Sequence, residues 1–175
     1  MIPVERMGRL ALAVAVVAAS MVLPIGVWQA DRASAAGPCD APVNVIACEN
    51  SKPGTPSSNW DVNGSGDPSI QGYSTSMSVQ PGETVRFKIK TTASSYHFDI
   101  LRMGYYQGNG ARLVAARLRP TATLPQTQPP CLTLTDSTGL IDCGNWAQSA
   151  SWAVPSTAVS GVYICLLYTS DAADE

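Results

Sequence analysis

Residues 84–91 alternate strictly between apolar and polar side chains, and this period of two constrains the fold more than any other feature. Val85, Phe87 and Ile89 share one side of an extended segment, and a basic residue follows each of them. Successive side chains of a β-strand point to opposite faces, whereas a helix would scatter these apolar residues around its surface. The segment is therefore predicted to be a half-buried strand with one solvated face.

The same pattern recurs along the chain. In residues 96–103, Tyr96, Phe98 and Ile100 fall on one face, and Asn109-Gly110 is a tight-turn signal. Further strands are predicted at 112–118, 150–154 and 162–164, and no segment after residue 35 has sustained helical periodicity. Short strands separated by turn signals predict an all-β fold, an antiparallel β-sandwich of the immunoglobulin/fibronectin-like class. Because a strand is only beginning at 162–164, we expect the sandwich to be truncated before its last strand.

The N-terminal residues have the three zones of a secretory signal peptide. Arg6 and Arg9 precede an almost wholly apolar run at 10–27, and small residues occupy 33–36. We expect residues 1–35 to form a signal-peptide helix that is cleaved near Ala35. The mature protein would then be secreted or held at the cell surface, with no stable membrane span. The alternative is an uncleaved anchor, since the run is near the lower limit of about 17 residues for a spanning helix.

The C-terminal residues 165–175 have the sequence that translation of a transposase sequencing adapter gives, Cys-Leu-Leu-Tyr-Thr-Ser-Asp-Ala-Ala-Asp-Glu. We expect this tail to be non-native and not to belong to the fold; a genuine strand with an acidic end is the alternative. The predicted organisation is a signal peptide at 1–35, a lead-in at 36–72, a β-sandwich at 73–164 and the tail at 165–175. The lead-in is rich in turn residues, so we expect an irregular, disulfide-containing segment that packs on the sheet.

Four cysteines remain outside the tail: Cys39, Cys48, Cys131 and Cys143. An even number in an exported chain indicates disulfides. Of the three pairings, the spacing favours two local bridges, Cys39–Cys48 and Cys131–Cys143, each worth roughly 2–3 kcal/mol in the chain-entropy model. A zinc site is the alternative, but the 8 and 11 intervening residues fit metal knuckles poorly and the chain has one histidine.

Residues 36–164 carry eight basic and eight acidic side chains, so the predicted mature part is neutral. Proteins that bind nucleic acid concentrate positive charge on one face. The neutral balance therefore argues against a nucleic-acid partner.

Side-chain oxygens recur at every second position of one turn-rich segment: Asp61, Asn63, Ser65 and Asp67. This is the spacing of the first ligands of a calcium loop, with Gly66 at the sixth position. Gly72 stands at the twelfth position, where such a loop needs a bidentate glutamate. A solvated turn is the competing interpretation, and no other cofactor is suggested for this stretch.

Two further groups of side chains are candidate sites. Tyr105 and Tyr106 lie in a glycine-rich connection, where exposed aromatic rings could form a ligand platform for sugars. His97 and Asp99 share the outer face of their strand and are near enough to pair, but no nucleophile accompanies them. We therefore interpret them as a surface pair and assign no catalytic residue.

Several runs of the chain resemble one family of secreted bacterial proteins. The runs are Glu49–Trp60, Ser69–Tyr73, Arg102–Arg112, Cys143–Trp146, Trp152–Pro155 and Ser160–Tyr163. They resemble the N-terminal region of N,N-dimethylformamidase beta (large) subunit-like proteins, and Arg-x-Gly-Tyr-Tyr and Ser-Gly-Val-Tyr are the most specific. The resemblance implies a β-sandwich followed by a catalytic-type domain with iron ligands further downstream. None of those ligands has a counterpart here.

These features predict a secreted accessory β-sandwich that is not itself catalytic. Its expected partners are the downstream domain of the same full-length chain and a cell-surface glycan. One alternative is the N-terminal part of an exported amidohydrolase, a C–N amide hydrolase whose catalytic domain is missing from this stretch. Another is a calcium-stabilised or carbohydrate-binding surface module.

Overall fold

The computed structural model describes residues 37–64, 66–133 and 139–169 of the chain. The predicted signal peptide lies outside these residues. Within the part that the structure describes, no helix is long and apolar enough to cross a bilayer.

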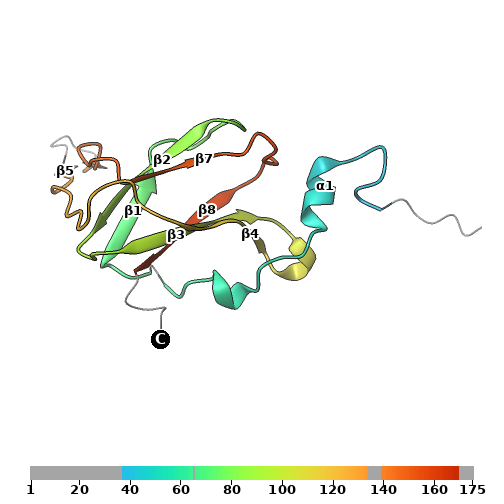
Figure 1. Ribbon diagram of the computed structural model, residues 1–175, viewed down its shortest axis with the longest axis horizontal. Helices are drawn as coiled ribbons and strands as arrows, with labels where there is room; N and C mark the ends of the chain where they lie inside the picture. Colours follow the sequence, from blue (N-terminus) through green and yellow to red (C-terminus); the bar gives the residue numbers. More distant parts are fainter. Residues whose placement is uncertain (1–36, 65, 134–138, 170–175) are drawn as a thin grey trace, which may run out of the picture. The chain divides into compact units, whose positions relative to one another are not determined.

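Strands dominate the described residues, and all their pairings are antiparallel. One three-stranded sheet has the order β1-β2-β7, a second has the order β4-β3-β8, and β5 and β6 form a small hairpin (Figure 1). The elements are α1 Val45–Asn50, η1 Ser57–Asn59, β1 Ile70–Ser74, β2 Thr84–Thr91, β3 Tyr96–Met103, η2 Tyr106–Gly108, β4 Ala111–Leu118, β5 Leu132–Thr133, β6 Ile141–Asp142, β7 Ala150–Ala153 and β8 Tyr163–Thr169. The all-β prediction is confirmed.

One hydrophobic core joins the two three-stranded sheets. Its buried side chains alternate along the two central strands as the sequence pattern predicts: Val85, Phe87 and Ile89 in β2, and Tyr96, Phe98 and Ile100 in β3. The rings of Phe87 and Phe98 meet edge to face with centroids 5.4 Å apart, an arrangement that aromatic pairs favour. Contact between the central strands therefore holds the sheets together.

The alternation in β3 breaks at its C-terminal end. The pairing register with β4 shifts on either side of Ile100, and Leu101 and Arg102 are both buried. On β4, Arg117 has a φ of 50° and donates its backbone N–H to Asp99 Oδ1 at 2.6 Å. This irregular end of β3 carries the Arg102 guanidinium into the protein.

The lead-in contains more regular structure than we expected from its turn-rich sequence. Asn44 Oδ1 accepts hydrogen bonds from the N–H groups of Ile46 and Ala47, each at 3.1 Å, and so caps the short helix α1. β1 begins at Ile70, within the range expected to be irregular, because its backbone pairs with β2. The prediction of an irregular lead-in was therefore wrong at α1 and β1.

Both local disulfides are present. Cys39 joins Cys48 with a Cα–Cα distance of 4.6 Å, and Cys131 joins Cys143 with 4.3 Å. The first ties the start of the lead-in to α1, and the second closes the loop that contains β5 and β6.

The last strand is longer than the sequence pattern predicts. β8 pairs with β3 along its whole length, from Tyr163 to Thr169, and Cys165 is a free thiol. It therefore includes five residues of the predicted non-native tail, and the origin of residues 165–175 stays a prediction.

The contribution of the shared core to stability can be tested by substitution. Replacing the buried Phe98 by alanine is expected to lower the free energy of unfolding by about 3–5 kcal/mol, since it removes the ring and leaves a cavity. Met77→Ala is the matched control, because Met77 is fully exposed and its loss should change stability by less than about 0.5 kcal/mol. Denaturant unfolding measures both; equal midpoints for the two variants would contradict the described core.

Candidate functional site

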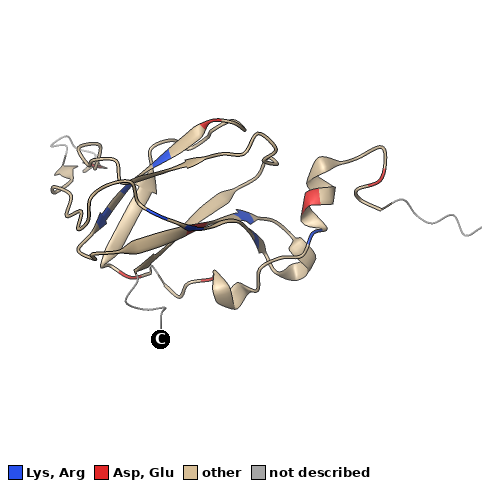
Figure 2. Cartoon of the chain, viewed as in Figure 1, with Lys and Arg blue, Asp and Glu red and all other residues tan. Residues whose placement is uncertain are grey.

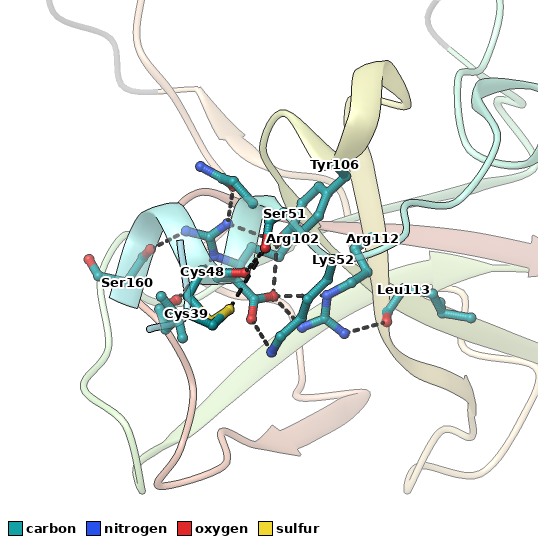
Figure 3. A network of polar contacts seen from close by, with 12 residues as sticks. Cys39, Cys48, Ser51, Lys52, Arg102, Tyr106, Arg112, Leu113 and Ser160 are labelled. Atoms are coloured by element: carbon teal, nitrogen blue, oxygen red, sulfur yellow. Dashed lines mark hydrogen bonds and ion pairs between the residues drawn. A yellow bond between two sulfur atoms is a disulfide. The ribbon is translucent and has the colours of Figure 1, made fainter. Parts of the chain in front are cut away.

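A buried polar network joins four segments that are distant in the sequence (Figure 3). α1 contributes Glu49, the end of β3 contributes Arg102, η2 contributes Tyr106, and β4 contributes Arg112. The exposed fractions of Glu49, Arg102 and Tyr106 are 2%, 3% and 0%. Such groups are found inside proteins only where they are paired and hydrogen-bonded, so their partners decide what this network does.

The Glu49 carboxylate is the centre of the network. Its Oε2 accepts from Lys52 Nζ at 2.6 Å, and its Oε1 accepts from the Tyr106 hydroxyl at 3.1 Å. The guanidinium of Arg112 donates to the same Oε1 through both Nε, at 2.8 Å, and Nη2. Figure 2 shows the single acidic position of α1, and this helix buries its glutamate while Val45 and Ile46 stay exposed. α1 is therefore held by charge rather than by an apolar face.

These partners shift the pKa of Glu49 strongly. Burial alone would raise it, but the hydrogen bonds from Lys52, Arg112 and Tyr106 outweigh burial and lower the pKa to about 2. The pKa of Arg112 moves the opposite way: burial would lower it, and Glu49 raises it. Both groups are thus charged at neutral pH, and Glu49 is too weak a base to take up a proton there.

Arg102 lies beside this ion pair and has no carboxylate partner of its own among the described residues. Nη1 donates to the Tyr106 hydroxyl at 2.8 Å, and Nη2 donates to Ser160 O at 2.6 Å. The remaining acceptors are Val159 O, Asn50 Oδ1 and Met103 O, at 3.2, 3.1 and 3.3 Å. Nη1 therefore has three acceptors for its two N–H groups, whereas Nη2 and Nε have one acceptor each. Through these bonds Arg102 cross-links α1, η2 and the segment before β8.

Tyr106 connects the two halves of the network. Its hydroxyl accepts from Arg102 and donates to Glu49, and the guanidinium carbons of Arg102 and Arg112 lie 5.9 and 5.8 Å from its ring centroid. Its backbone has a φ of 40°, which few non-glycine residues adopt. The contacts of the side chain hold the turn in this strained conformation.

Two glycines of the sequence motifs leave room for the Arg102 side chain. A Cβ at Gly161 would lie 2.7 Å from Arg102 Nε, and a Cβ at Gly104 would lie 3.1 Å from Arg102 Nη1 and 2.8 Å from Tyr106 Cε2. The Arg-x-Gly-Tyr-Tyr and Ser-Gly-Val-Tyr motifs therefore pack against each other around the Arg102 side chain. We call the network of Glu49, Lys52, Arg102, Tyr106 and Arg112 the clamp. It is closed, because every charge in it is directed at an internal partner.

The structure separates the two tyrosines of the predicted ligand platform. Tyr105 is 70% exposed, whereas Tyr106 is fully buried in the clamp. The prediction of a paired platform is corrected on this point, because a hydroxyl held between Arg102 and Glu49 turns the Tyr106 ring inward. Only Tyr105 stays available at the surface.

The predicted calcium ligands do not gather into a described site. Asp67 Oδ1 accepts the N–H of Ser69 at 2.8 Å, and this bond lowers the Asp67 pKa. Asp61 and Asn63 are exposed, and Ser65 lies outside the described residues. Among the residues that the structure covers, no three His, Cys, Asp or Glu side chains are grouped to hold a metal ion. Calcium binding stays a prediction.

His97 and Asp99 both face outward from β3, as expected. They do not bond to each other: the His97 ring stacks on Tyr168 with centroids 4.9 Å apart, and Asp99 holds the backbone of Arg117. The sequence therefore predicted that both side chains face outward, but it did not predict which groups they contact.

Comparison with known proteins finds one similar family. Residues 97–175 match the family model described as N,N-dimethylformamidase beta subunit-like, C-terminal. The matched segment, somewhat less than half of the chain, is therefore similar to this family. No curated protein and no solved structure matched the chain.

The match covers part of the clamp and leaves part outside. Arg102, Tyr106, Arg112 and Ser160 lie within the dimethylformamidase-like segment, whereas Glu49 precedes it. The family description names the C-terminal part of the subunit, whereas the sequence resemblance placed this stretch in the N-terminal region. The order of domains in the full protein therefore stays a prediction.

The clamp predicts a marked difference between two neighbouring substitutions. Glu49→Ala leaves the Arg112 guanidinium and the Tyr106 hydroxyl without their shared acceptor, and is expected to lower the free energy of unfolding by about 3 kcal/mol. Lys52→Ala removes a half-exposed partner of the same carboxylate and should cost less than about 1 kcal/mol. Denaturant titration compares the two, and equal losses would rule out Arg112 and Tyr106 as the decisive partners.

The same carboxylate predicts how stability depends on pH. The pKa of Glu49 falls from its ordinary value of 4.5 to about 2 on folding. Its contribution is therefore complete above about pH 4.5 and is lost as the pH falls through about 2. Unfolding measured from pH 6 to pH 2 should show a smaller loss of stability in Glu49→Gln than in the parent chain; parallel curves would contradict the assignment.

Proposed function

We propose that this stretch is an accessory, non-catalytic β-sandwich of an exported N,N-dimethylformamidase beta subunit-like protein. Its role is to pack against the rest of the full-length protein and hold a defined surface there. The observation that carries the proposal is the closed clamp. The charged side chains of the family motifs, Arg102 and Glu49 among them, bond inside the domain rather than pointing into an open site.

The sandwich itself, in its immunoglobulin-like form, is supported by how the strands share the core. β2 and β3 are the central strands of different sheets, and their inward side chains meet through Phe87 and Phe98. Consecutive strands are also exchanged between the sheets, because β7 joins β2 and β8 joins β3. Two sheets sharing one core, with strands that cross between them, are characteristic of this class.

Export is supported by the cysteines. Disulfides persist in oxidising compartments and are rare in reducing ones, and this chain has two of them. Together with the expected signal peptide, they favour a secreted or cell-surface location. A cell-surface glycan is then a suitable partner for Tyr105, whose exposed ring offers a stacking face.

The alternative is that the full-length protein is an amide hydrolase with its active site elsewhere. The iron ligands that the family resemblance implies have no counterpart in this stretch, and the described residues contain no group that fits a metal. On this alternative, the clamp still acts as scaffold rather than as acid or base.

The proposal is tested by assaying two proteins side by side for hydrolysis of N,N-dimethylformamide, with ferrous iron supplied. These are this chain and the longer protein that the proposal assumes. The chain alone is expected to be inactive whatever the full-length product does. Turnover by the chain that is lost in Glu49→Gln, while the variant stays folded by circular dichroism, would overturn the non-catalytic assignment.

Glycan binding is tested separately on this chain by titration with cell-wall polysaccharide. Tyr105→Ala should weaken any binding at least tenfold. Tyr73→Ala is the aromatic control, because Tyr73 is partly exposed but its hydroxyl is bonded to Cys143 O at 2.6 Å. Equal effects of the two variants would remove Tyr105 as the contact.

A further inference from the structure

Three basic side chains form a row on the outer face of the sheet β1-β2-β7. Arg86, Lys88 and Lys90 occupy alternate positions of β2 and point away from the core side of that strand. Alternate residues of a strand are roughly 6.5 Å apart, so the row is roughly 13 Å long. We call these three side chains the basic row; basic positions along β2 are blue in Figure 2. Positive charge is thus concentrated on one strand, although residues 36–164 are neutral in total.

The basic row is not neutralised within the part of the chain that the structure describes. The two ion pairs found there both belong to the clamp, on other elements of the fold. Arg86 and Lys90 are exposed, and Lys88 donates to a neutral acceptor, Gly144 O, at 2.7 Å. Like charges in a row repel each other, and an anion that pairs with them relieves this repulsion. The charge of this surface therefore indicates an anionic ligand.

Neutral hydrogen-bonding side chains lie beside both ends of the basic row. In the pairing register, Gln71 is opposite Lys90 and Ser151 is opposite Arg86. Residues directly opposite each other in an antiparallel pair project on the same face, with Cβ atoms about 4.5–5.5 Å apart. The face thus offers an amide and a hydroxyl group next to its cations. A ligand that carries both carboxylates and hydroxyl groups would find partners for each.

A disulfide-closed loop borders this face and is anchored to it. The Tyr73 hydroxyl donates to Cys143 O at 2.6 Å, and the Tyr73 ring lies 5.9 Å from the ring of Trp146. The second disulfide closes the same loop. The runs Ser69–Tyr73 and Cys143–Trp146 of the family resemblance therefore meet at this border. Because these contacts fix the loop before any ligand arrives, binding beside it needs little further ordering.

We propose that this face binds an acidic polysaccharide, whose carboxylates pair with the basic row. The polymer lies along β2, with its hydroxyl groups beside Gln71 and Ser151. The inference goes beyond the proposed function, which assigns sugar stacking to Tyr105. It rests on that function in one respect, the export of the protein to where such polymers occur. Tyr73 is a support of the border rather than a contact, because its hydroxyl and ring are engaged by the loop.

The linear arrangement favours a polymer with spaced charges over other anions. A small anion such as phosphate is held by donors that converge on one point, whereas these cations lie in a row. Nucleic acid is held through many phosphate contacts on a broad basic surface, and this row has only three cations. Binding to a membrane surface uses apolar side chains that insert beside the cations. The neighbours of the row in the pairing register are instead an amide and a hydroxyl group.

The first test titrates this chain with polygalacturonate, a polymer of carboxylated sugars, and follows binding by calorimetry. Binding is expected at low salt and should weaken roughly tenfold between about 50 and about 200 mM sodium chloride, since the ion pairs are screened and bound counterions are released. Dextran has no carboxylates and is the uncharged control, for which no salt-dependent binding is expected. Absence of binding, or binding of polygalacturonate that salt does not weaken, would overturn the proposal.

Two double variants separate the basic row from net charge. Arg86→Gln with Lys90→Gln removes both exposed cations of the row and should weaken binding of polygalacturonate roughly tenfold. Arg117→Gln with Arg119→Gln removes the same net charge from exposed positions on β4 and directly after it, and should keep binding within about twofold. Because all four side chains are exposed, circular dichroism should show both variants folded. Equal losses in the two variants would overturn the proposal.

Two further probes address the other polyanions. Single-stranded polydeoxyadenylate and vesicles of phosphatidylglycerol are titrated at the same salt concentration. The proposal expects polygalacturonate to bind the most tightly of the three. Tighter binding of the nucleic acid or of the vesicles, lost in the variant of the basic row, would assign the face to that partner and overturn the proposal.

The test is independent of the proposed function. Tyr105→Ala should leave the salt-dependent binding of polygalacturonate unchanged, because stacking on an aromatic ring does not require a charged ligand. An equal loss in Tyr105→Ala and in the variant of the basic row would overturn the assignment to β2. The amide-hydrolysis assay involves neither polygalacturonate nor these variants, so the two proposals fail separately.

Discussion

The hydrogen bonds and ion pairs of the Glu49 carboxylate are the interactions on which the arrangement of the surrounding segments depends. The carboxylate is buried and negative, and it is stabilised because Lys52, Arg112 and Tyr106 all donate to it. Without it, the Arg112 cation loses its counter-ion and Tyr106 loses the acceptor that keeps its ring inside. Since Tyr106 also accepts from Arg102, the disturbance would reach the segment before β8. One carboxylate thus links α1 to both strands of the β3–β4 hairpin and, through Tyr106 and Arg102, to the segment before β8.

Apolar contacts and the polar clamp stabilise different parts of this domain. Apolar burial between β2 and β3 joins the sheets, as in most β-proteins. The clamp at the end of β3 orders the segments that lack an apolar face, including a helix whose valine and isoleucine are exposed. In the described part of the chain, β1 and β8 each have one edge without a strand partner, although both strands contribute side chains to the core.

Much of the strand structure was predictable and most of the clamp was not. β2 and β3 have the predicted bounds because alternating side chains report directly on burial. α1 was missed because six residues are too few to show a helical period, and a cap and a disulfide define it instead. Tyr106 was assigned to the surface because its loop is rich in glycine, yet those glycines make room for buried partners. A charged residue on the inward phase of a strand, as Arg102 is, was the one signal that could have revealed the network.

The partners of Glu49 are far away along the chain, which affects when the clamp can form. Arg112 lies 63 residues after Glu49, and the backbone acceptor at Ser160 lies 58 residues after Arg102. A polypeptide that emerges N-terminus first from a ribosome or a translocation channel must therefore hold α1 undocked until β3, η2 and β4 have emerged. During that interval the Cys39–Cys48 link, whose two cysteines are only nine residues apart, can already form. Docking of α1 would then follow the emergence of β4.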